Sequence, residues 1–345
     1  MRSSRLDSGT TRVPGELALL RQIRSRAARA PGLSLRLGIG DDCALLRPRA
    51  GEELAVTTDL SIAGRHFRLD WHPAESVGHR ALARGLSDLA AMGARPVAAF
   101  LSLGLPRELT NSTTRRKTWV QRFLDGLLAL AATHKTPLAG GDLSESPIPF
   151  ADIVLIGSVP TGCALLRSGA RPGHLLYVTG SLGGSAAALA RLAQLAAAQP
   201  AGSNPPRISQ KLATVLAPHL YPQPRIAQGL ALQRRGLASA AIDVSDGIST
   251  DLTHICQESG VAAEVDAALL PIHPAASLSR ALNGGEDYEL LFTAPPAVRL
   301  PRSIGGVKIT RIGRIVPALR NQPALTLITP QGREALQPQG WEHFS

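Results

Sequence analysis

The sequence contains few aromatic residues, and this shortage determines how its core must be built. Phe, Trp and Tyr make up only 3% of the 345 residues, whereas apolar residues of all kinds reach 44%. Aliphatic side chains must therefore fill a sizeable core. The length suits one large domain or two of ordinary size. No uncharged apolar run approaches the about 18 residues of a membrane-spanning helix, so we predict no membrane segment.

Cysteine is also scarce. Cys43, Cys163 and Cys256 are far apart and odd in number, which excludes a zinc-binding spacing and a disulfide framework. This usage is typical of a reducing compartment, and we predict a cytoplasmic protein. Residues 1–14 are polar and lack the apolar core of a secretion signal, so we expect a flexible tail. A mitochondrial presequence over residues 1–29 is the alternative interpretation.

Lysine supplies only four of the 37 basic residues, although the formal net charge is +11. The arginines are dispersed along the chain, and Arg115-Arg116-Lys117 is the densest local group. No series of aromatic residues, on which unpaired bases could stack, accompanies them. We therefore predict a solvated basic surface and no nucleic-acid partner.

Acidic residues are few, yet many fall in short motifs at the ends of apolar runs. In Leu37–Leu46, a turn framed by glycines carries Asp41 and Asp42. Aspartate often bonds its own backbone in turns, so a structural role for this pair stays open. The other motifs are Thr57-Thr58-Asp59, Ser87-Asp88, Gly140-Gly141-Asp142 and Asp243-Val244-Ser245-Asp246. Because Mg²⁺ prefers carboxylate oxygens, their recurrence predicts a site for a metal–phosphate substrate.

Several common catalytic motifs are absent from the sequence. It has no Gly-x-x-x-x-Gly-Lys-[Ser/Thr] phosphate loop, no His-Glu-x-x-His, no nucleophile-elbow serine and no paired cysteines. The acids favour phosphoryl transfer, in which catalysis is mainly positioning and neutralisation of charge. A phosphate acceptor would need no strong general base, because its second pKa is about 6.

The clearest secondary-structure pattern is a helix over residues 73–92, which Pro73 opens and Gly93 ends. Further helices are predicted over 16–29, 113–134, 186–198, 225–237 and 249–260, and strands over 53–59, 97–105, 137–142, 153–159, 174–179, 240–246, 307–312 and 324–328. Their irregular alternation favours an α+β fold over a doubly wound sheet.

A turn rich in Gly and Pro over residues 160–173 predicts the boundary between two mixed α/β domains. We expect an N-terminal domain over residues 15–159 and a C-terminal domain over residues 160–345. A second glycine-rich turn, Gly180–Ser185, precedes a predicted helix. Helix N-termini favour phosphate, but the turn lacks the dinucleotide spacing, so this indication is weak.

The ordered motifs of the chain resemble those of a known family. They are Gly38-Ile39-Gly40-Asp41-Asp42, Thr57-Thr58-Asp59, the loop around His66, Leu86–Gly93, Gly140-Gly141-Asp142, Arg167-Ser168-Gly169-Ala170, Ile242–Gly247, Gly284-Gly285-Glu286-Asp287-Tyr288-Glu289-Leu290 and Trp341. The set resembles the thiamine-monophosphate kinases, a family of the aminoimidazole-ribonucleotide-synthetase-like ATP-binding superfamily. The run over residues 284–290 separates these kinases from their superfamily relatives.

The resemblance implies direct transfer of the ATP γ-phosphate to thiamine monophosphate, with several Mg²⁺ ions and ATP as co-substrate. The implied magnesium positions are Asp42, Thr57, Thr58, Asp59, Asp88, Asp142, Asp243 and Asp246. The implied ATP positions are Gly141, Asp142, Arg167 and Ser245, and the implied substrate positions are His66, Glu286 and Trp341. A carboxylate and an aromatic face suit a cationic thiazolium. Asp41 is either a direct ligand or a turn residue that orients Asp42.

The resemblance also implies a homodimer in which the N-terminal domains pair into a β-barrel, with the ATP site close to the interface. Two alternatives stay open. Another ATP-dependent synthetase of the same superfamily would share the acids but should lack the 284–290 run. A basic nucleic-acid-binding or scaffold protein with a degenerate site would bind nucleic acid in a salt-sensitive way and show no Mg²⁺-dependent turnover.

Overall fold

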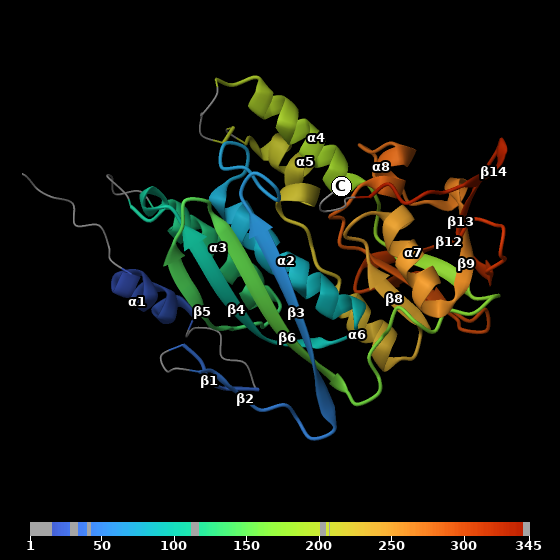
Figure 1. The fold of residues 1–345 in the computed structure, drawn as a ribbon, viewed down its shortest axis with the longest axis horizontal. Helices are drawn as coiled ribbons and strands as arrows, with labels where there is room; N and C mark the ends of the chain where they lie inside the picture. Colours follow the sequence, from blue (N-terminus) through green and yellow to red (C-terminus); the bar gives the residue numbers. More distant parts are fainter. Residues whose placement is uncertain are drawn as a thin grey trace, which may run out of the picture.

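The computed structural model describes residues 16–27, 34–39, 43–111, 117–200, 205–206 and 208–340. The predictions for the tail 1–14, for Asp41 and Asp42, and for Trp341 lie outside the described residues. Two sheets, each with helices packed against it, make up most of the described chain (Figure 1). A short hairpin of β1 (Leu35–Leu37) and β2 (Leu45–Leu46) precedes the first sheet.

The first sheet has four strands in the order β3-β6-β4-β5. They are β3 (Glu52–Ile62), β4 (Arg95–Leu105), β5 (Leu138–Glu145) and β6 (Phe150–Pro160). β6 runs antiparallel to both of its neighbours, whereas β4 and β5 are parallel. Residues alternate along β3 and β6, so that one face of the sheet packs on helices. Helix α1 (Glu16–Ala27) contacts β5 at the edge of this sheet.

Helix α2 (Ala74–Ala91) is the central element of the molecule. It contacts β3, β4 and β6 of the first sheet and also helix α6 (Ile226–Arg234) and strand β8 (Ala240–Asp243). Helix α3 (Trp119–Thr133) packs alongside α2 at close range. A Cβ on Gly126 would lie 1.8 Å from the Glu75 carbonyl oxygen, and one on Gly78 would lie 1.9 Å from that of Phe123. Both glycines are therefore required by the approach of the two helices.

The second sheet has eight strands, with the path β14-β13-β9-β12-β7-β10-β8 and β11 paired to β12. The strands are β7 (Leu175–Thr179), β8 (Ala240–Asp243), β9 (Val261–Asp266), β10 (Leu290–Ala294), β11 (Ser303–Ile304), β12 (Val307–Pro317), β13 (Leu325–Thr329) and β14 (Gly332–Ala335). Among the described strand pairs of this sheet, only β9–β13 is parallel, so this sheet is also mixed. Helix α7 (Ile248–Ser259) inserts Ile248, Leu252 and Ile255 into its core.

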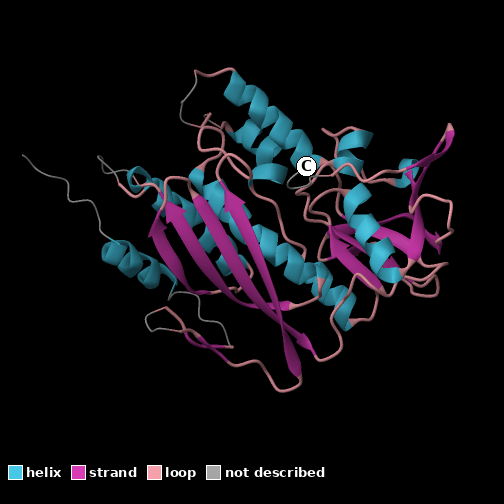
Figure 2. Ribbon diagram, viewed as in Figure 1, coloured by secondary structure: helices cyan, strands magenta, loops and turns pink. Residues whose placement is uncertain are grey.

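The remaining helices connect the strands of the second half. Helices α4 (Gly184–Ala197) and α5 (Gln210–Leu220) form an antiparallel pair around a small core that includes Leu192 and Leu216, and α8 (Leu278–Asn283) follows β9 (Figure 2). None of the described helices combines the length and the hydropathy that a bilayer-spanning segment needs.

The structure confirms the predicted α+β class, with two mixed sheets, and it differs from the helix predictions at α3, α5 and α8. Helix α3 begins at Trp119 rather than at residue 113, because Thr118 and Gln121 form a capping box at its start. Helix α5 was not predicted at all. Its sequence contains Pro218, a residue that usually breaks helices but is tolerated here near the C-terminal end. The division at residues 159 and 160 stays a prediction.

The close packing of α2 on α3 predicts that Gly126→Ala destabilises the protein. The added methyl would meet backbone atoms that cannot move independently, so we expect a loss of about 1–3 kcal/mol in the free energy of unfolding. Urea unfolding measures this loss. Ala129→Ser, on the exposed side of the same helix, is the control and should change the value by less than about 0.5 kcal/mol. Equal effects of the two substitutions would contradict the packing.

Candidate active site

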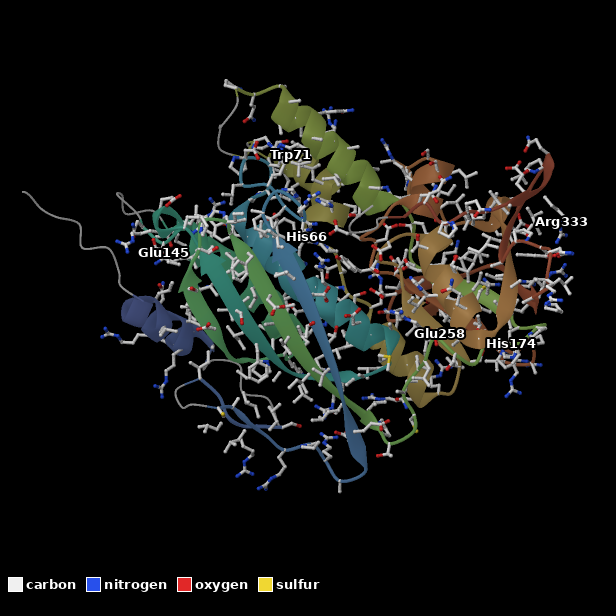
Figure 3. All side chains as sticks on the ribbon, in the orientation of Figure 1. His66, Trp71, Glu145, His174, Glu258 and Arg333 are labelled. Atoms are coloured by element: carbon white, nitrogen blue, oxygen red, sulfur yellow. The ribbon has the colours of Figure 1, made fainter. Side chains whose placement is uncertain are left out.

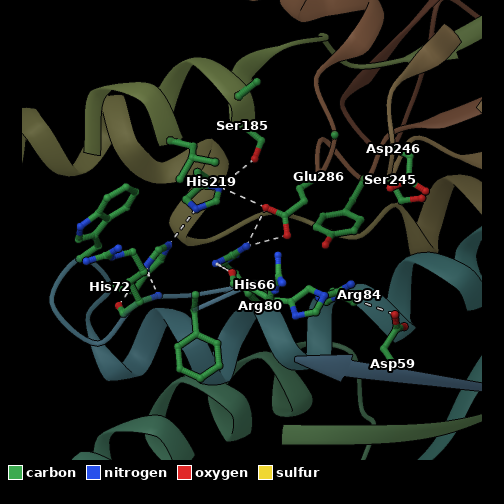
Figure 4. Close-up of a pocket in the computed structure, with 18 of the residues that line it drawn as sticks. Asp59, His66, His72, Arg80, Arg84, Ser185, His219, Ser245, Asp246 and Glu286 are labelled. Atoms are coloured by element: carbon green, nitrogen blue, oxygen red, sulfur yellow. Dashed lines mark hydrogen bonds and ion pairs between the residues drawn. The ribbon is translucent and has the colours of Figure 1, made fainter. Parts of the chain in front are cut away.

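A cavity of about 450 Å³ lies beside α2, between the two halves of the chain. Its walls come from the end of β3, the loop 64–72, α2, α4, the turn after β8 and the segment 285–288. The predicted site residues that line it are Asp59, His66, Asp88, Asp243, Ser245, Asp246 and Glu286. Figure 3 places His66 near the middle of the molecule, and Figure 4 shows the cavity in close-up.

The segment 284–290 forms one wall of the cavity with an unusual backbone. Glu286 and Tyr288 have φ angles of 65° and 50°. These angles lie in the left-handed region, which residues other than glycine rarely adopt. The Glu286 N–H donates to the Ser245 carbonyl at 2.7 Å, and the Tyr288 N–H donates to that of Val244 at 2.9 Å. A Cβ on Gly285 would lie 2.4 Å from the same Ser245 oxygen. These contacts hold Glu286 in the cavity wall.

The two other acids of this segment are engaged in structural contacts. Asp287 accepts from the N–H groups of Gly183 and Ser185 at the start of α4, and burial raises the pKa of its carboxyl group to about 7. Glu289 is buried and accepts two bonds of 2.6 Å from Arg225. Since a carboxylate already occupies the N-terminus of α4, the phosphate-binding interpretation of the glycine turn is wrong.

Glu286 is held mainly by Arg80 of α2. The Arg80 Nη2 lies 2.6 and 2.7 Å from the two carboxylate oxygens, and the Arg80 side chain is only 6% exposed. Burial by itself raises the pKa of Glu286, but Arg80, His219 and Arg84 outweigh it and lower this pKa to about 2. The carboxylate is 26% exposed, so it presents a permanent negative charge to the cavity.

His66 lies next to this ion pair. Its Nδ1 accepts from the N–H of Ile62, the last residue of β3, at 3.0 Å. Its carbonyl oxygen accepts from the Arg80 Nη1 at 3.1 Å. The same arginine therefore fixes the positions of two of the predicted substrate residues, His66 and Glu286.

The far end of the cavity is a cluster of carboxylates. Thr57 donates to Asp88, Ser87 donates to Asp243 at 2.6 Å, and the Arg84 Nε lies 3.5 Å from Asp59. Burial and the neighbouring Asp88 raise the pKa values of both Asp59 and Asp243 to about 7. These carboxylates disfavour one another's charge, and a bound cation would relieve that repulsion.

The cluster fits magnesium in one further respect. The Oδ2 atom of Asp59 is buried and has no hydrogen-bond partner, although a buried carboxylate oxygen usually has one. Within the described ranges, no three His, Cys, Asp or Glu side chains are arranged to hold a metal ion. Mg²⁺ commonly takes only one or two carboxylates and completes its shell with phosphate oxygens and water. The donor set therefore suits a metal that arrives with a phosphorylated substrate.

Arg167 also belongs to this end of the cavity, although it is not part of the lining. Burial raises the pKa of Asp88, and the positive charge of the exposed Arg167 guanidinium opposes this rise. A guanidinium group has the geometry to bind a phosphate through two hydrogen bonds.

Thr58, Gly141 and Asp142 are not brought into this cavity. Neighbouring residues of a strand point to opposite faces, so Thr57 and Asp59 face α2 whereas Thr58 lies on the outer face. Asp142 is exposed on β5, whose order in the sheet places it three strand spacings from β3, or about 14 Å. Within one chain, these predicted positions are thus separated from the acidic cluster.

Two family models together match most of the chain. The family model described as AIR synthase related protein, N-terminal domain, matches residues 40–159, and the model for the C-terminal domain matches residues 171–321. The thiamine-monophosphate kinase of Escherichia coli K12 is 40% identical over 96% of this chain and 98% of its own length. The chain belongs to the thiamine-monophosphate kinase family. The Bacillus subtilis member is 32% identical, over 90% of this chain and 94% of its own.

Solved structures of the family share the fold. The thiamine-monophosphate kinase of Stenotrophomonas maltophilia K279a superposes with a TM-score of 0.74 at 41% identity, over 88% of this chain and 95% of that one. AaThiL complexed with AMPPCP and TMP gives 0.72 at 27% identity over the whole of both chains. The hydrogenase maturation protein HypE of E. coli, at 17% identity and 0.63, covers 93% of this chain and 98% of its own and shows the fold alone.

Sequence reasoning missed most of the other residues of the cavity wall, among them Arg80 and Arg84 of α2, His72, His219 of α5, and Tyr288. The two arginines are one helical turn apart on a helix whose surroundings are almost wholly apolar. That pattern was the only available indication, because a guanidinium inside an apolar helix must meet an anion.

The buried ion pair predicts that Glu286→Gln lowers the stability of the protein. The substitution leaves the Arg80 guanidinium without an anion, and we expect a loss of about 3 kcal/mol in the free energy of unfolding at pH 7. The folded pKa of about 2 lies below the unfolded value of about 4.3. The difference from wild type should therefore shrink as the pH falls through this window.

Glu145→Gln is the matched control for this experiment. It breaks the exposed Arg107–Glu145 pair, whose side chains are 67% and 64% exposed, and Figure 3 shows Glu145 on the surface. Urea unfolding of this variant should give a value within about 0.5 kcal/mol of wild type. Similar losses in both variants would show that the Arg80–Glu286 pair has no special role.

Proposed function

We propose that the protein transfers the γ-phosphate of ATP to thiamine monophosphate, giving thiamine diphosphate and ADP. The proposal rests on the different chemistry of the two ends of the cavity. Glu286 presents an anion at one end, and Asp59, Asp88 and Asp243 form a metal-type acidic cluster at the other. A substrate with a cationic ring and a phosphate matches both ends, and family membership names that substrate.

Each end has a separate task in this scheme. Glu286, together with His66 and Trp341, binds the thiazolium end, and Arg80 keeps the carboxylate ionised and oriented. Asp59, Asp88, Asp243 and Asp246, together with Asp42, Thr57, Thr58 and Asp142, are the proposed magnesium ligands. When bound, Mg²⁺ supplies charge neutralisation between two phosphate groups that would otherwise repel each other. Thr57 and Ser87 orient the acids through their hydroxyl groups.

The transfer itself is proposed to be direct and in line. The acceptor phosphate is largely ionised at neutral pH and needs no general base. The hydroxyl groups of Thr57 and Ser87 already donate to carboxylates. We therefore assign them the task of orienting these carboxylates and not that of accepting a phosphate. The proposed ATP contacts are Gly141, Asp142, Arg167 and Ser245.

We also propose a homodimer in which the outer faces of the first sheet pair into a barrel. On β3, Leu54, Val56 and Leu60 share the outer face and are 44%, 61% and 45% exposed. An apolar row of this kind on a sheet face is typical of an interaction surface. Thr58 lies on the outer face of this sheet, and Asp142 lies on its edge strand β5. In the dimer, we expect these residues of one copy to lie next to the acidic cluster of the other copy. The domain division at residues 159 and 160 and the cytoplasmic location belong to the same proposal.

The function predicts Mg²⁺-dependent formation of thiamine diphosphate by the purified protein. Product should appear with ATP, thiamine monophosphate and Mg²⁺, and should fall to background when the metal is removed by EDTA. Chromatography of the thiamine esters measures it. A folded protein that hydrolyses or binds ATP without making thiamine diphosphate would favour another ATP-dependent synthetase of the superfamily.

Direct transfer predicts that no phosphorylated enzyme accumulates. Incubation with [γ-³²P]ATP and Mg²⁺ but without acceptor, followed by acid quenching, should leave no label on the protein. Labelled ATP with acceptor is the positive control, since the label must then appear in thiamine diphosphate. Stoichiometric labelling of the chain in the first experiment would require a covalent intermediate and would exclude direct transfer.

The shared site predicts that two inactive variants restore activity when they are mixed. Asp142→Asn and Asp243→Asn should each fold normally and lose most activity, because each removes a proposed metal ligand. In a symmetric dimer, random mixing makes half the dimers heterodimers, each with one intact site, so about a quarter of the wild-type rate should return. No recovery, with subunit exchange verified by differently tagged chains, would place both residues in one chain's site.

A further inference from the structure

Two buried histidines lie against the cavity, and the proposed mechanism uses neither of them. His72, in the loop before α2, and His219, in α5, are 147 residues apart in sequence and each only 2% exposed. Their Nε2 atoms are 3.0 Å apart, so one of them must donate a hydrogen bond to the other. Figure 4 shows the pair on the side of Glu286 away from Asp59.

The surroundings of His72 determine which nitrogen donates. The backbone N–H of Arg68 donates to the His72 Nδ1 at 3.1 Å, so this nitrogen must present a lone pair. The Arg68 carbonyl, 3.2 Å from the same Nδ1, already accepts from the N–H groups of Trp71 and His72. The hydrogen of the neutral imidazole is therefore on Nε2, and His72 donates to His219.

The surroundings of His219 indicate the same direction for the hydrogen bond between the two rings. Its Nε2 accepts from His72, so its own hydrogen is on Nδ1. That nitrogen lies 3.1 Å from the Ser185 Oγ and 3.4 Å from a carboxylate oxygen of Glu286. The opposite tautomer would direct a lone pair at the anion. Both ends of this series of contacts thus agree on one direction, from the Arg68 backbone through the two rings toward Ser185 and Glu286.

Both rings remain neutral at physiological pH, as this arrangement needs. Burial and then the nearby charge of Arg80 lower the pKa of His72 to about 4. The same two causes lower the pKa of His219 well below its usual value. Two neutral imidazoles can share a single hydrogen between their Nε2 atoms, whereas two protonated ones could not.

We propose that His72 is a positioning residue, which acts through the tautomer of His219 to hold the Glu286 carboxylate for the cationic end of the acceptor substrate. Arg80 binds Glu286 from one side, and the His219 Nδ1–H faces it from another. Without His72, the His219 imidazole loses its Nε2 donor and is free to adopt the other tautomer. The carboxylate would then shift toward Arg80. This inference rests on the proposed function.

Kinetics of His72 variants test the consequence for the substrate. His72→Leu should raise the KM for thiamine monophosphate about tenfold, the effect of losing about 1.4 kcal/mol. The KM for ATP and kcat should stay within about twofold of wild type. His72→Gln keeps an N–H near the position of Nε2 and should restore most of the lost affinity.

His79→Leu is the matched control for a merely structural role. His79 is also a buried histidine with one strong contact, from its Nε2 to the Pro222 carbonyl at 2.7 Å, but it does not line the cavity. This variant should lower thermal stability and leave the KM for thiamine monophosphate unchanged. If His72→Leu behaves in the same way, His72 only packs the fold and the proposal fails.

A spectroscopic test does not depend on turnover. Long-range ¹H–¹⁵N correlation spectra of the ¹⁵N-histidine-labelled protein distinguish the two neutral tautomers, and the His72→Gln spectrum assigns the pair. We expect an Nδ1–H tautomer for His219 in wild type and its loss in His72→Leu. An Nε2–H tautomer in wild type would overturn the proposal whatever the activity. Absence of thiamine diphosphate formation with the expected tautomer would refute only the proposed function.

Discussion

The buried ion pair between Arg80 and Glu286 joins two segments that are 206 residues apart in the sequence. Arg80 belongs to the central helix, which packs on the first sheet, and Glu286 belongs to the segment that leads into β10 of the second. A guanidinium buried to this degree is tolerated only next to an anion. The pair therefore fixes how the segment 284–290 lies against α2, and with it the shape of the cavity.

The same segment shows how a short motif can serve several purposes at once. Asp287 caps α4, and Glu289 binds Arg225, so the chain that follows Glu286 is anchored at two points. Tyr288 is buried and lies beside Glu286 in the cavity wall. Glu286 is left as the one acid of the run that faces the cavity. Its positive φ angle is the cost of this arrangement, and neighbouring backbone bonds offset it.

The sequence predicted those parts of the site that depend on local chemistry. Pro73 and the apolar periodicity predicted α2, and Asp59, Asp88, Asp243 and Asp246 were expected together and do line one cavity. Properties that depend on tertiary context were not predictable. Thr57 and Thr58 are adjacent in one motif, yet a strand directs them to opposite faces. Arg80 was not singled out in the sequence, and His219 lies in a helix that Pro218 concealed.

A crystal structure with thiamine monophosphate, AMPPCP and Mg²⁺ would test the central claim most directly, because it fixes the orientation of the substrate in the cavity. The account predicts the thiazolium ring next to the carboxylate of Glu286 and the phosphate directed toward Asp59, Asp88 and Asp243. The opposite orientation, with phosphate on Arg80 and the ring among the acids, would contradict the division of the cavity into a cation-binding end and a metal–phosphate end.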